Sequence, residues 1–287
     1  MGFRIPEAGL HAEKLLPERI RIRMNIGIIR NQTLRVGKKL LSLCLALVAV
    51  FTFAAPACAA GAEVAVGDRI FYGSYPQTEE GTDHTPIEWQ VLDVQDGKAL
   101  CLSYYGLDAQ PFNTVWAEVC WDGCTLRTWL NDDFLNAAFT PEEQAAVELT
   151  HVENDRPQNY GGYSRFHAED TDDRIFLLSY AEANKYLKVI YWGIDDETNV
   201  WSRVTPTPYA ISRGAWRDLN FFTVDGDRAG WWWLRSPGLI QGNTARVIWR
   251  GSLCNRKVQT TDGCVRPAFW LNLSQLPDGC TLQGSAE

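Results

Sequence analysis

Two short segments near the C-terminus combine arginine with aromatic residues and proline. The first covers residues 231–238 with the sequence WWWLRSPG, and the second covers residues 264–270 with the sequence CVRPAFW. A guanidinium buried among aromatic rings must be paired and hydrogen-bonded, because an uncompensated charge is costly in apolar surroundings. The two arginines therefore predict either a structural network between neighbouring strands, which we favour, or a cationic fork for a carboxylate ligand. The signature that we expect to be structural comprises Trp232, Trp233, Arg235, Ser236, Arg266 and Pro267.

Cysteine chemistry is the second possibility, because six of the eight cysteines follow residue 60. An even number in an exported protein favours disulfides. Cys120 and Cys124 could close a tight loop worth about 2 kcal/mol, and Cys254 could face Cys264 across a hairpin. Cys120 and Cys124 could instead be half of a zinc site, but no second Cys or His pair has ligand spacing. We expect no metal and no cofactor.

Enzymatic motifs are sparse in this sequence. It has no Gly-x-Ser-x-Gly motif, no phosphate-binding glycine loop and no EF-hand spacing in its acidic clusters. Glu88, Asp93 and Asp108 could provide the carboxylate pair of a glycosidase, which requires a separation of about 5 to 9.5 Å, but any acidic protein of this size offers such pairs. The sequence therefore favours a non-catalytic domain.

Aromatic residues in a loop-rich stretch, residues 190–230, give the strongest indication of function. Exposed tryptophan and tyrosine beside arginine are typical of recognition surfaces. The alternative is that these loops only cover the edge of a sheet. The predicted ligand-binding residues are Trp192, Trp201, Arg203, Tyr209, Arg213 and Trp216.

Residues 1–59 are expected to be a signal peptide. Arg35, Lys38 and Lys39 precede an apolar run over residues 40–55, and small residues follow at a cleavage spacing. The run is shorter than the roughly 20 residues of a membrane span, so we expect no span after cleavage. A start at Met24 would give an ordinary signal length, which makes residues 1–23 a suspected mis-assigned start. A lipid-modified Cys58 and an uncleaved anchor are the alternatives.

The mature chain is expected to be acidic. Cleavage after Ala59 leaves 18 basic and 32 acidic residues, compared with a net charge of −8 for the whole sequence. A nucleic-acid partner would need a basic face, so this class is excluded.

Hydrophobic patterns predict the elements that must position these residues. Strands are expected near residues 67–76, 87–94, 98–105, 174–178, 231–235, 245–249 and 265–273, and helices over 125–138, from 141 and over 180–187. Asp96-Gly97 predicts a hairpin turn. The fold class is α+β, with a mostly antiparallel sheet and helices inserted mid-chain. A single domain over residues 64–275 and a short tail over 276–287 are expected.

Several motifs together resemble a known family. Residues 67–77, 87–93, 126–131, 173–179, 232–238 and 265–268 resemble, in matching order, the bacterial domain of unknown function DUF6273. That family has no established activity, and this chain departs from its pattern by placing Cys264 before Val265. A more distant resemblance, to C-type-lectin-like folds including the sulfatase-modifying formylglycine-generating enzymes, implies a compact core with ligand-binding loops. Those enzymes use cysteines four residues apart, unlike Cys254 and Cys264.

These observations predict an exported, non-catalytic domain at the bacterial cell surface that binds a glycan or an extracellular protein or peptide. The alternatives are a cell-wall glycan hydrolase, a divergent lectin-fold oxidase and a structural envelope module.

Overall fold

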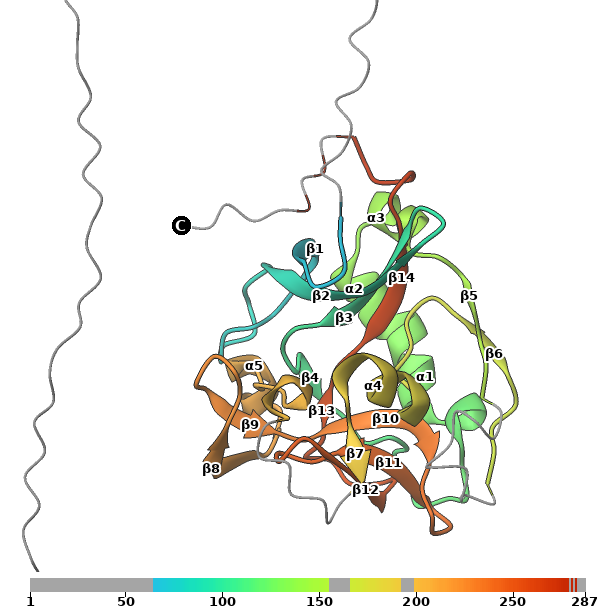
Figure 1. Ribbon diagram of the computed structural model, residues 1–287, viewed down its shortest axis with the longest axis vertical. Coiled ribbons are helices and arrows are strands. Elements are labelled where there is room, and N and C mark those ends of the chain that lie inside the picture. The colour runs from blue at the N-terminus through green and yellow to red at the C-terminus, as the bar shows by residue number, and fades with distance from the viewer. Residues whose placement is uncertain (1–63, 155–165, 192–198, 279, 281, 283–287) are drawn as a thin grey trace, which may run out of the picture. The chain divides into compact units, whose positions relative to one another are not determined.

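The computed structural model describes residues 64–154, 166–191, 199–278, 280 and 282 (Figure 1). All of them belong to the second of two units into which the chain divides, Pro56–Glu287. The expected signal peptide and Trp192 lie outside the described residues. Within the described part of the chain, no helix is long and apolar enough to cross a membrane.

A four-stranded antiparallel sheet occupies the upper half of Figure 1. Its strands, in spatial order, are β1 (Arg69–Tyr75), β2 (Thr85–Gln95), β3 (Lys98–Ser103) and β14 (Ala268–Asn272). The predicted Asp-Gly hairpin joins β2 to β3, and Asp96 and Gly97 have φ of 49° and 73°, as a type I′ turn requires. Part of the expected tail adds to this sheet, because Phe71 N–H donates to the Leu282 carbonyl at 2.8 Å.

A six-stranded mixed sheet lies in the lower part of this folded unit as drawn in Figure 1. Its spatial order is β4 (Asp108–Ala109), β13 (Cys264–Val265), β10 (Trp232–Pro237), β11 (Asn243–Val247), β12 (Ser252–Lys257) and β7 (Ile190–Tyr191). The β13–β10 and β12–β7 pairs are parallel, and the other pairs are antiparallel. Two small hairpin-like sheets pair β5 (Thr150–Val152) with β6 (Thr171–Asp173) and β8 (Arg217–Phe222) with β9 (Arg228–Gly230).

The helices lie mid-chain, which confirms the predicted α+β class. They are α1 (Thr125–Trp129), α2 (Leu135–Ala138), α3 (Pro141–Ala146), α4 (Tyr180–Leu187) and α5 (Pro208–Ser212), with 3₁₀ turns at Trp121–Gly123 and Val200–Ser202 and a π-helical turn at Leu130–Phe134 between α1 and α2. Capping boxes begin α3 at Thr140 and α4 at Ser179, because each side chain and the glutamate three residues later satisfy free backbone N–H groups.

The strand predicted over residues 174–178 is wrong. Residues 175–178 are buried as expected, but β6 ends at Asp173 and Phe176 forms only an isolated bridge with Ala268. The Asn131 side chain replaces a strand partner, since its Oδ1 accepts hydrogen bonds from the backbone N–H groups of Arg174 and Ile175. Periodicity detected burial here but could not identify the hydrogen-bond partner.

The chain crosses between the two large sheets at Arg266-Pro267. The predicted strand over residues 265–273 is therefore two strands, β13 in the lower sheet and β14 in the upper one. The segment from β3 to β4 makes the same crossing beside it, and Ser103 N–H donates to the Pro267 carbonyl at 2.9 Å. Pro267 has no N–H, so the break in pairing leaves no donor unsatisfied at that residue.

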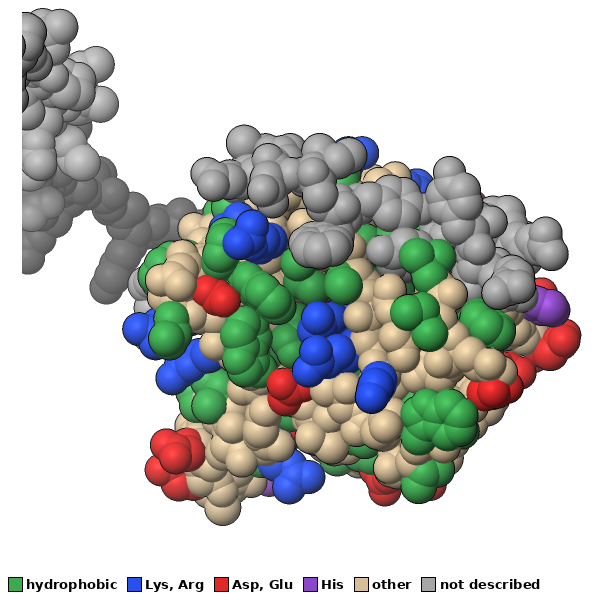
Figure 2. Space-filling model, turned by 90° about the horizontal axis from the view of Figure 1, so that it is seen from below, with side chains coloured by type: hydrophobic (Ala, Val, Ile, Leu, Met, Phe, Trp, Pro, Cys, Tyr) green, Lys and Arg blue, Asp and Glu red, His purple; other side chains and the backbone are tan. Residues whose placement is uncertain are grey.

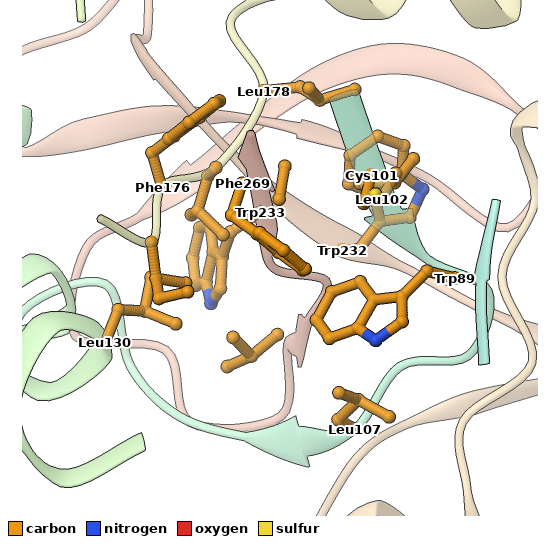
Figure 3. Close-up of a cluster of buried hydrophobic side chains, with 14 of the residues drawn as sticks. Trp89, Cys101, Leu102, Leu107, Leu130, Phe176, Leu178, Trp232, Trp233 and Phe269 are labelled. Atoms are coloured by element: carbon orange, nitrogen blue, oxygen red, sulfur yellow. The ribbon is translucent and has the colours of Figure 1, made fainter. Parts of the chain in front are cut away.

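Large aromatic side chains fill the core between the sheets (Figure 3). Trp89 meets Phe269 edge to face with ring centroids 4.7 Å apart. Three of the buried indole N–H groups donate to backbone carbonyls: Trp89 to Tyr72, Trp232 to Ser202 and Trp233 to Gln110. A fourth, that of Trp121, donates to the Asp173 carboxylate at 2.9 Å. The core thus fixes the strand ends and crossing segments that carry charged side chains.

The predicted disulfides are absent, because all six described cysteines are free thiols. Cys254 lies on β12 and Cys264 on β13, and β10 and β11 separate these strands. Three strand spacings amount to about 14 Å, whereas a disulfide requires Cα atoms within about 7 Å. Cys120 and Cys124 flank the 3₁₀ turn, and the Cys124 Sγ caps α1 by accepting from Arg127 N–H at 3.4 Å.

Candidate functional site

Arg235, the first signature arginine, is fully engaged within the protein. Its guanidinium forms two hydrogen bonds with the Glu182 carboxylate, and Glu182 also belongs to the capping box of α4. The remaining donors reach Asn154 Oδ1 at 3.1 Å, the Leu177 carbonyl at 2.9 Å and the Glu153 carbonyl at 3.0 Å. The hydroxyl of Ser236 accepts from Tyr180 N–H at 2.8 Å. This half of the signature joins β10 to the start of α4.

Arg266, the second signature arginine, is equally buried but much less satisfied. Its exposed fraction is 2%, its Nε donates to the Ser103 carbonyl at 2.8 Å, and its guanidinium lies 5.0 Å from the centroid of the Trp232 ring. Among the described residues, Nη1 has no hydrogen-bond partner and Arg266 forms no ion pair. Burial lowers the pKa of Arg266 to about 10, and the neighbouring Tyr104 and Cys264 offset this only in part. The side chain is therefore a buried, uncompensated cation at neutral pH.

A pocket of about 290 Å³ opens at Arg266. Five parts of the chain form it: the start of β1, β2 with the residue that follows β3, the Val200–Ser202 turn with the segment after it, the connection between β8 and β9, and the crossing at Arg266. Its lining residues are Gly67, Arg69, Gln90, Tyr104, Val200, Trp201, Arg203, Thr205, Thr223, Val224, Asp225 and Arg266. We call it the arginine pocket.

An ordered ion-pair network forms one wall of the arginine pocket. Arg69 stacks on Tyr104 with its guanidinium carbon 3.4 Å from the ring centroid, and it pairs with Glu88 at 3.1 Å and Asp225 at 3.3 Å. The Tyr104 hydroxyl donates to the same Asp225 carboxylate. Burial, followed by that hydrogen bond, raises the pKa of Tyr104 to about 12, so it stays a neutral donor. These contacts fix the connection between β8 and β9 against the upper sheet.

Trp201 and Arg203 form the opposite side of the pocket. Arg203 donates through Nη1 to the Phe222 carbonyl at 2.7 Å and lies 5.5 Å from the Phe221 ring centroid. Trp201 is 62% exposed, and the 3₁₀ turn that carries it is anchored because Ser202 Oγ donates to the Gly251 carbonyl. An exposed indole next to a cationic pocket is a suitable surface for stacking a ligand ring.

The structure brings only two of the predicted ligand-binding residues into this pocket, Trp201 and Arg203. Tyr209 meets Tyr75 edge to face at 5.8 Å, and Arg213 pairs at 3.7 Å with Asp108, a carboxyl whose pKa is raised by burial. Trp216 packs on Trp249 at 4.8 Å. These three have structural partners, and Trp192 lies outside the described residues.

Sequence reasoning missed Arg69, Tyr104 and Asp225 as site residues. Arg69 was detectable in principle, since it is a charged residue at the start of an otherwise apolar and aromatic strand. Asp225 is 156 positions away from Arg69, and no local pattern links the two.

A second pocket of about 650 Å³ adjoins the first and shares Thr205 with it. Its lining residues are Gln77, Tyr105, Thr205, Pro206, Thr207, Pro208, Ile211, Arg217, Phe222, Gly226, Asp227 and Arg228. Figure 2 shows one face of the molecule, with a central group of basic side chains flanked by hydrophobic ones and most acidic side chains nearer its outline. The linings of the two pockets combine arginines with apolar and aromatic side chains.

The described residues offer donors and aromatic surface in this region rather than metal ligands. No cluster of three or more His, Cys, Asp or Glu side chains suited to a metal occurs among them. In the arginine pocket the one lining carboxylate, Asp225, is already held by Arg69 and Tyr104. This arrangement can bind and orient an anionic or polar group.

Comparison with known proteins identifies the family. The model of the family described as a domain of unknown function, DUF6273, matches residues 96–273, which is more than half of the chain. No curated protein and no solved structure matches the chain significantly. The likeness to C-type lectins stays a prediction. By the extent of this match, the chain belongs to the DUF6273 family.

Proposed function

We propose that this protein is an exported, non-catalytic binding domain of the bacterial cell surface that holds its ligand in the arginine pocket. The observation that carries the proposal is Arg266, a buried cation with an unpartnered Nη1 at a pocket. An unsatisfied buried donor costs about 1–3 kcal/mol, and more when it is charged. Nη1 itself is closed to solvent, so a ligand acceptor that reached it from the pocket with a small shift of the guanidinium would offset that cost.

The surrounding residues support binding without large rearrangement. The wall formed by Arg69, Tyr104 and Asp225 is already ordered by ion pairs and a hydrogen bond. Because these donors are held before a ligand arrives, little conformational entropy is lost on binding. The exposed Trp201 adds the aromatic contact that is typical of binding hot spots.

Export is supported by the pattern of residues 35–59, a basic segment followed by an apolar run and small residues. Fractionation of cells that produce the full chain tests it. Recovery outside the cytoplasm is expected for the full chain and not for a chain that starts at residue 60. Cytoplasmic recovery of both chains would refute export.

Glycan and peptide arrays test the binding site. We expect Trp201→Ala to weaken binding of the retained ligand at least tenfold. Trp116→Ala is the matched control, since Trp116 is 59% exposed and does not line the pocket. The proposal would be contradicted if wild type and Trp201→Ala bound equally well, or if the arrays retained no ligand. It would also be contradicted if NMR showed that the protein converts the ligand to a product.

A further inference from the structure

We propose that the second pocket binds an extended peptide segment of a partner protein, with an acidic side chain of the peptide at Arg217 and Arg228 and an apolar side chain against Phe222. This site is separate from the arginine pocket, although the two adjoin at Thr205. The inference follows from the charges on one face of a hairpin, the apolar remainder of the lining and the order of the segment that carries it.

The charged side chains of the second pocket come from one face of the β8–β9 hairpin. Arg217 lies opposite Gly230, and Phe222 lies opposite Arg228. Directly opposite residues share a face of a sheet, as do residues two positions apart on one strand, so Arg217, Arg228 and Phe222 lie on the same face. The two arginines are diagonal neighbours, about 7–8 Å apart, and long side chains at this separation can reach the same group.

Neither arginine is neutralised within the protein. Among the described residues, the side chains of Arg217 and Arg228 form no ion pair and no hydrogen bond, and both residues are exposed. Asp227 is the one carboxylate in the lining, so one positive charge remains. Guanidinium groups bind carboxylates through charge-assisted and often bidentate hydrogen bonds. An aspartate or glutamate of a ligand therefore matches both the charge and the donors of this face.

The remainder of the lining is largely apolar. Pro206, Pro208 and Ile211 contribute to it from one segment of the chain, and the Phe222 ring, whose residue is 44% exposed, adds to it from the hairpin. A sugar has hydroxyls around its ring, and these would lose water against such side chains without gaining partners. An apolar side chain of a peptide loses nothing by the same contact, so the lining favours a peptide over a glycan.

Two polar side chains of the lining suit a peptide backbone. Gln77 Nε2 donates to the Thr85 and Pro86 carbonyls at 3.3 and 3.0 Å, which holds the amide in place and leaves Oε1 to accept from a peptide N–H. Burial raises the pKa of Tyr105, so its hydroxyl stays a donor for a peptide carbonyl at neutral pH. A peptide has one N–H and one C=O at each residue, and it can use both partners.

The segment that carries the prolines is held in place before a ligand arrives. Gly106 N–H donates to the Thr205 carbonyl and Thr207 N–H donates to the Gly106 carbonyl, each at 2.9 Å. On the other side, Gly230 N–H donates to the Val204 carbonyl at 2.8 Å, which joins the segment to β9. Figure 1 shows α5, which continues this segment, beside β8 and β9. Little conformational entropy of the protein is therefore lost on binding.

The hairpin also predicts the spacing of the peptide residues. Arg217 and Phe222 lie opposite Gly230 and Arg228, which are two positions apart on β9. An extended peptide turns alternate side chains to the same side. The acidic residue is therefore expected two positions from the apolar one, as in Glu-x-Leu.

Arrays of acetylated and amidated hexapeptides test this inference, because blocked ends carry no charge of their own. The test set contains Glu-x-Leu with every residue type at x. Matched sets replace the glutamate by glutamine, replace the leucine by serine, or place the two residues side by side. We expect the test set to bind at least fivefold more tightly than each matched set, as measured by calorimetry. Added salt should weaken the binding, because the arginines are exposed.

Variants assign the two halves of the pattern. Arg217→Gln should remove the preference for glutamate over glutamine and leave the affinity for Gln-x-Leu unchanged. Phe222→Ser should weaken every peptide at least tenfold, and it keeps the backbone carbonyl that accepts from Arg203. Arg256→Gln and Val115→Ser are the matched controls, since both residues are exposed and line neither pocket. Circular-dichroism melting confirms that each variant is folded before its binding is compared.

The outcomes separate this inference from the proposed function. Equal binding of the glutamate and glutamine sets, or of wild type and Arg217→Gln to Glu-x-Leu, would overturn the role of the arginines. Tighter binding of oligogalacturonate than of any peptide, unaffected by Phe222→Ser, would overturn the peptide class.

Trp201→Ala, which tests the arginine pocket, should leave Glu-x-Leu binding unchanged. A loss in this variant would assign the peptides to the arginine pocket and overturn the second site. If Trp201→Ala releases the ligand of the arginine pocket but no hexapeptide depends on Arg217 or Phe222, the proposed function stands and this inference fails.

Discussion

Arg235 and Arg266 have similar sequence surroundings but different physical roles. Both are buried near aromatic rings, yet Arg235 has a carboxylate partner and carbonyl acceptors, whereas Arg266 has one carbonyl and an unpartnered Nη1. A buried charge that is fully paired belongs to the scaffold, and removing its partner leaves an uncompensated ion. A buried charge without a partner reduces stability.

Replacing each arginine by methionine should therefore give different results. Arg235→Met leaves the Glu182 carboxylate without its partner and is expected to lower the free energy of unfolding by about 3–5 kcal/mol. Arg266→Met removes a desolvated cation and one hydrogen bond, so it is expected to cost under about 1 kcal/mol or to stabilise.

Urea unfolding of both variants measures this difference, and binding of the ligand retained on the arrays should be lost in Arg266→Met. A loss of several kcal/mol from both replacements would show that Arg266 is structural as well. In that case the pocket would lack its functional cation.

At the scale of elements, the sequence predicted turns and helix starts correctly, but it did not predict correctly which distant segments pair with one another. The Asp96-Gly97 turn and the capping boxes at Thr140 and Ser179 depend on neighbours within four residues, so the sequence specified them. The wrong strand over residues 174–178 and the wrong Cys254–Cys264 pair share one cause. Their actual partners, Asn131 and the intervening strands β10 and β11, are set by tertiary packing.

The turn between β1 and β2 gives an element-scale prediction about pH. The Asp83 carboxylate accepts hydrogen bonds from the backbone N–H groups of Gln77 and Thr78 and from the hydroxyls of Thr78 and Thr85. The hydroxyl donors contribute most to lowering the pKa of Asp83 well below its ordinary value of 3.8. Its stabilising contribution is therefore fully present above about pH 4 and is lost as the pH falls further.

Urea unfolding of wild type and Asp83→Asn at pH 6, 4 and 2.5 checks this dependence. Wild type should be the more stable at pH 6, and the difference should shrink toward pH 2.5. Asp96→Asn is a suitable control in the next turn, where an Asn-Gly pair keeps the same geometry. A difference that does not change with pH would contradict the assigned role.

At the scale of the whole molecule, the site is the part that the sequence predicted least. Trp201 and Arg203 were found because their residue types are typical of recognition loops, but the pocket exists only where their loop meets β1, β3 and the crossing at Arg266. Those segments are far apart in the chain and are brought together by the two large sheets. Patterns of burial cannot specify which loops meet, because loops have no periodicity.

The same architecture predicts that the folded chain needs no disulfide. Its six described cysteines are free thiols. Aromatic packing and the two chain crossings between the sheets hold the core together instead. Burial raises the pKa of Cys120 to about 11 and those of Cys124 and Cys264 to about 12. Few reactive thiolates therefore exist at neutral pH, and a thiol reagent should modify these three slowly below about pH 10 unless the chain unfolds.

Thermal unfolding of the mature chain with and without dithiothreitol tests this prediction. The melting temperature is expected to be the same within about 1 °C, because reduction removes no cross-link from the unfolded state. Cys264→Ser should not reproduce the effect of a lost disulfide, since it changes only the buried contacts of one side chain with Gly106 and Gly230. A fall in melting temperature on reduction that corresponds to a loss of about 2–4 kcal/mol of stability would reveal a cross-link. That result would contradict the free thiols of the structure.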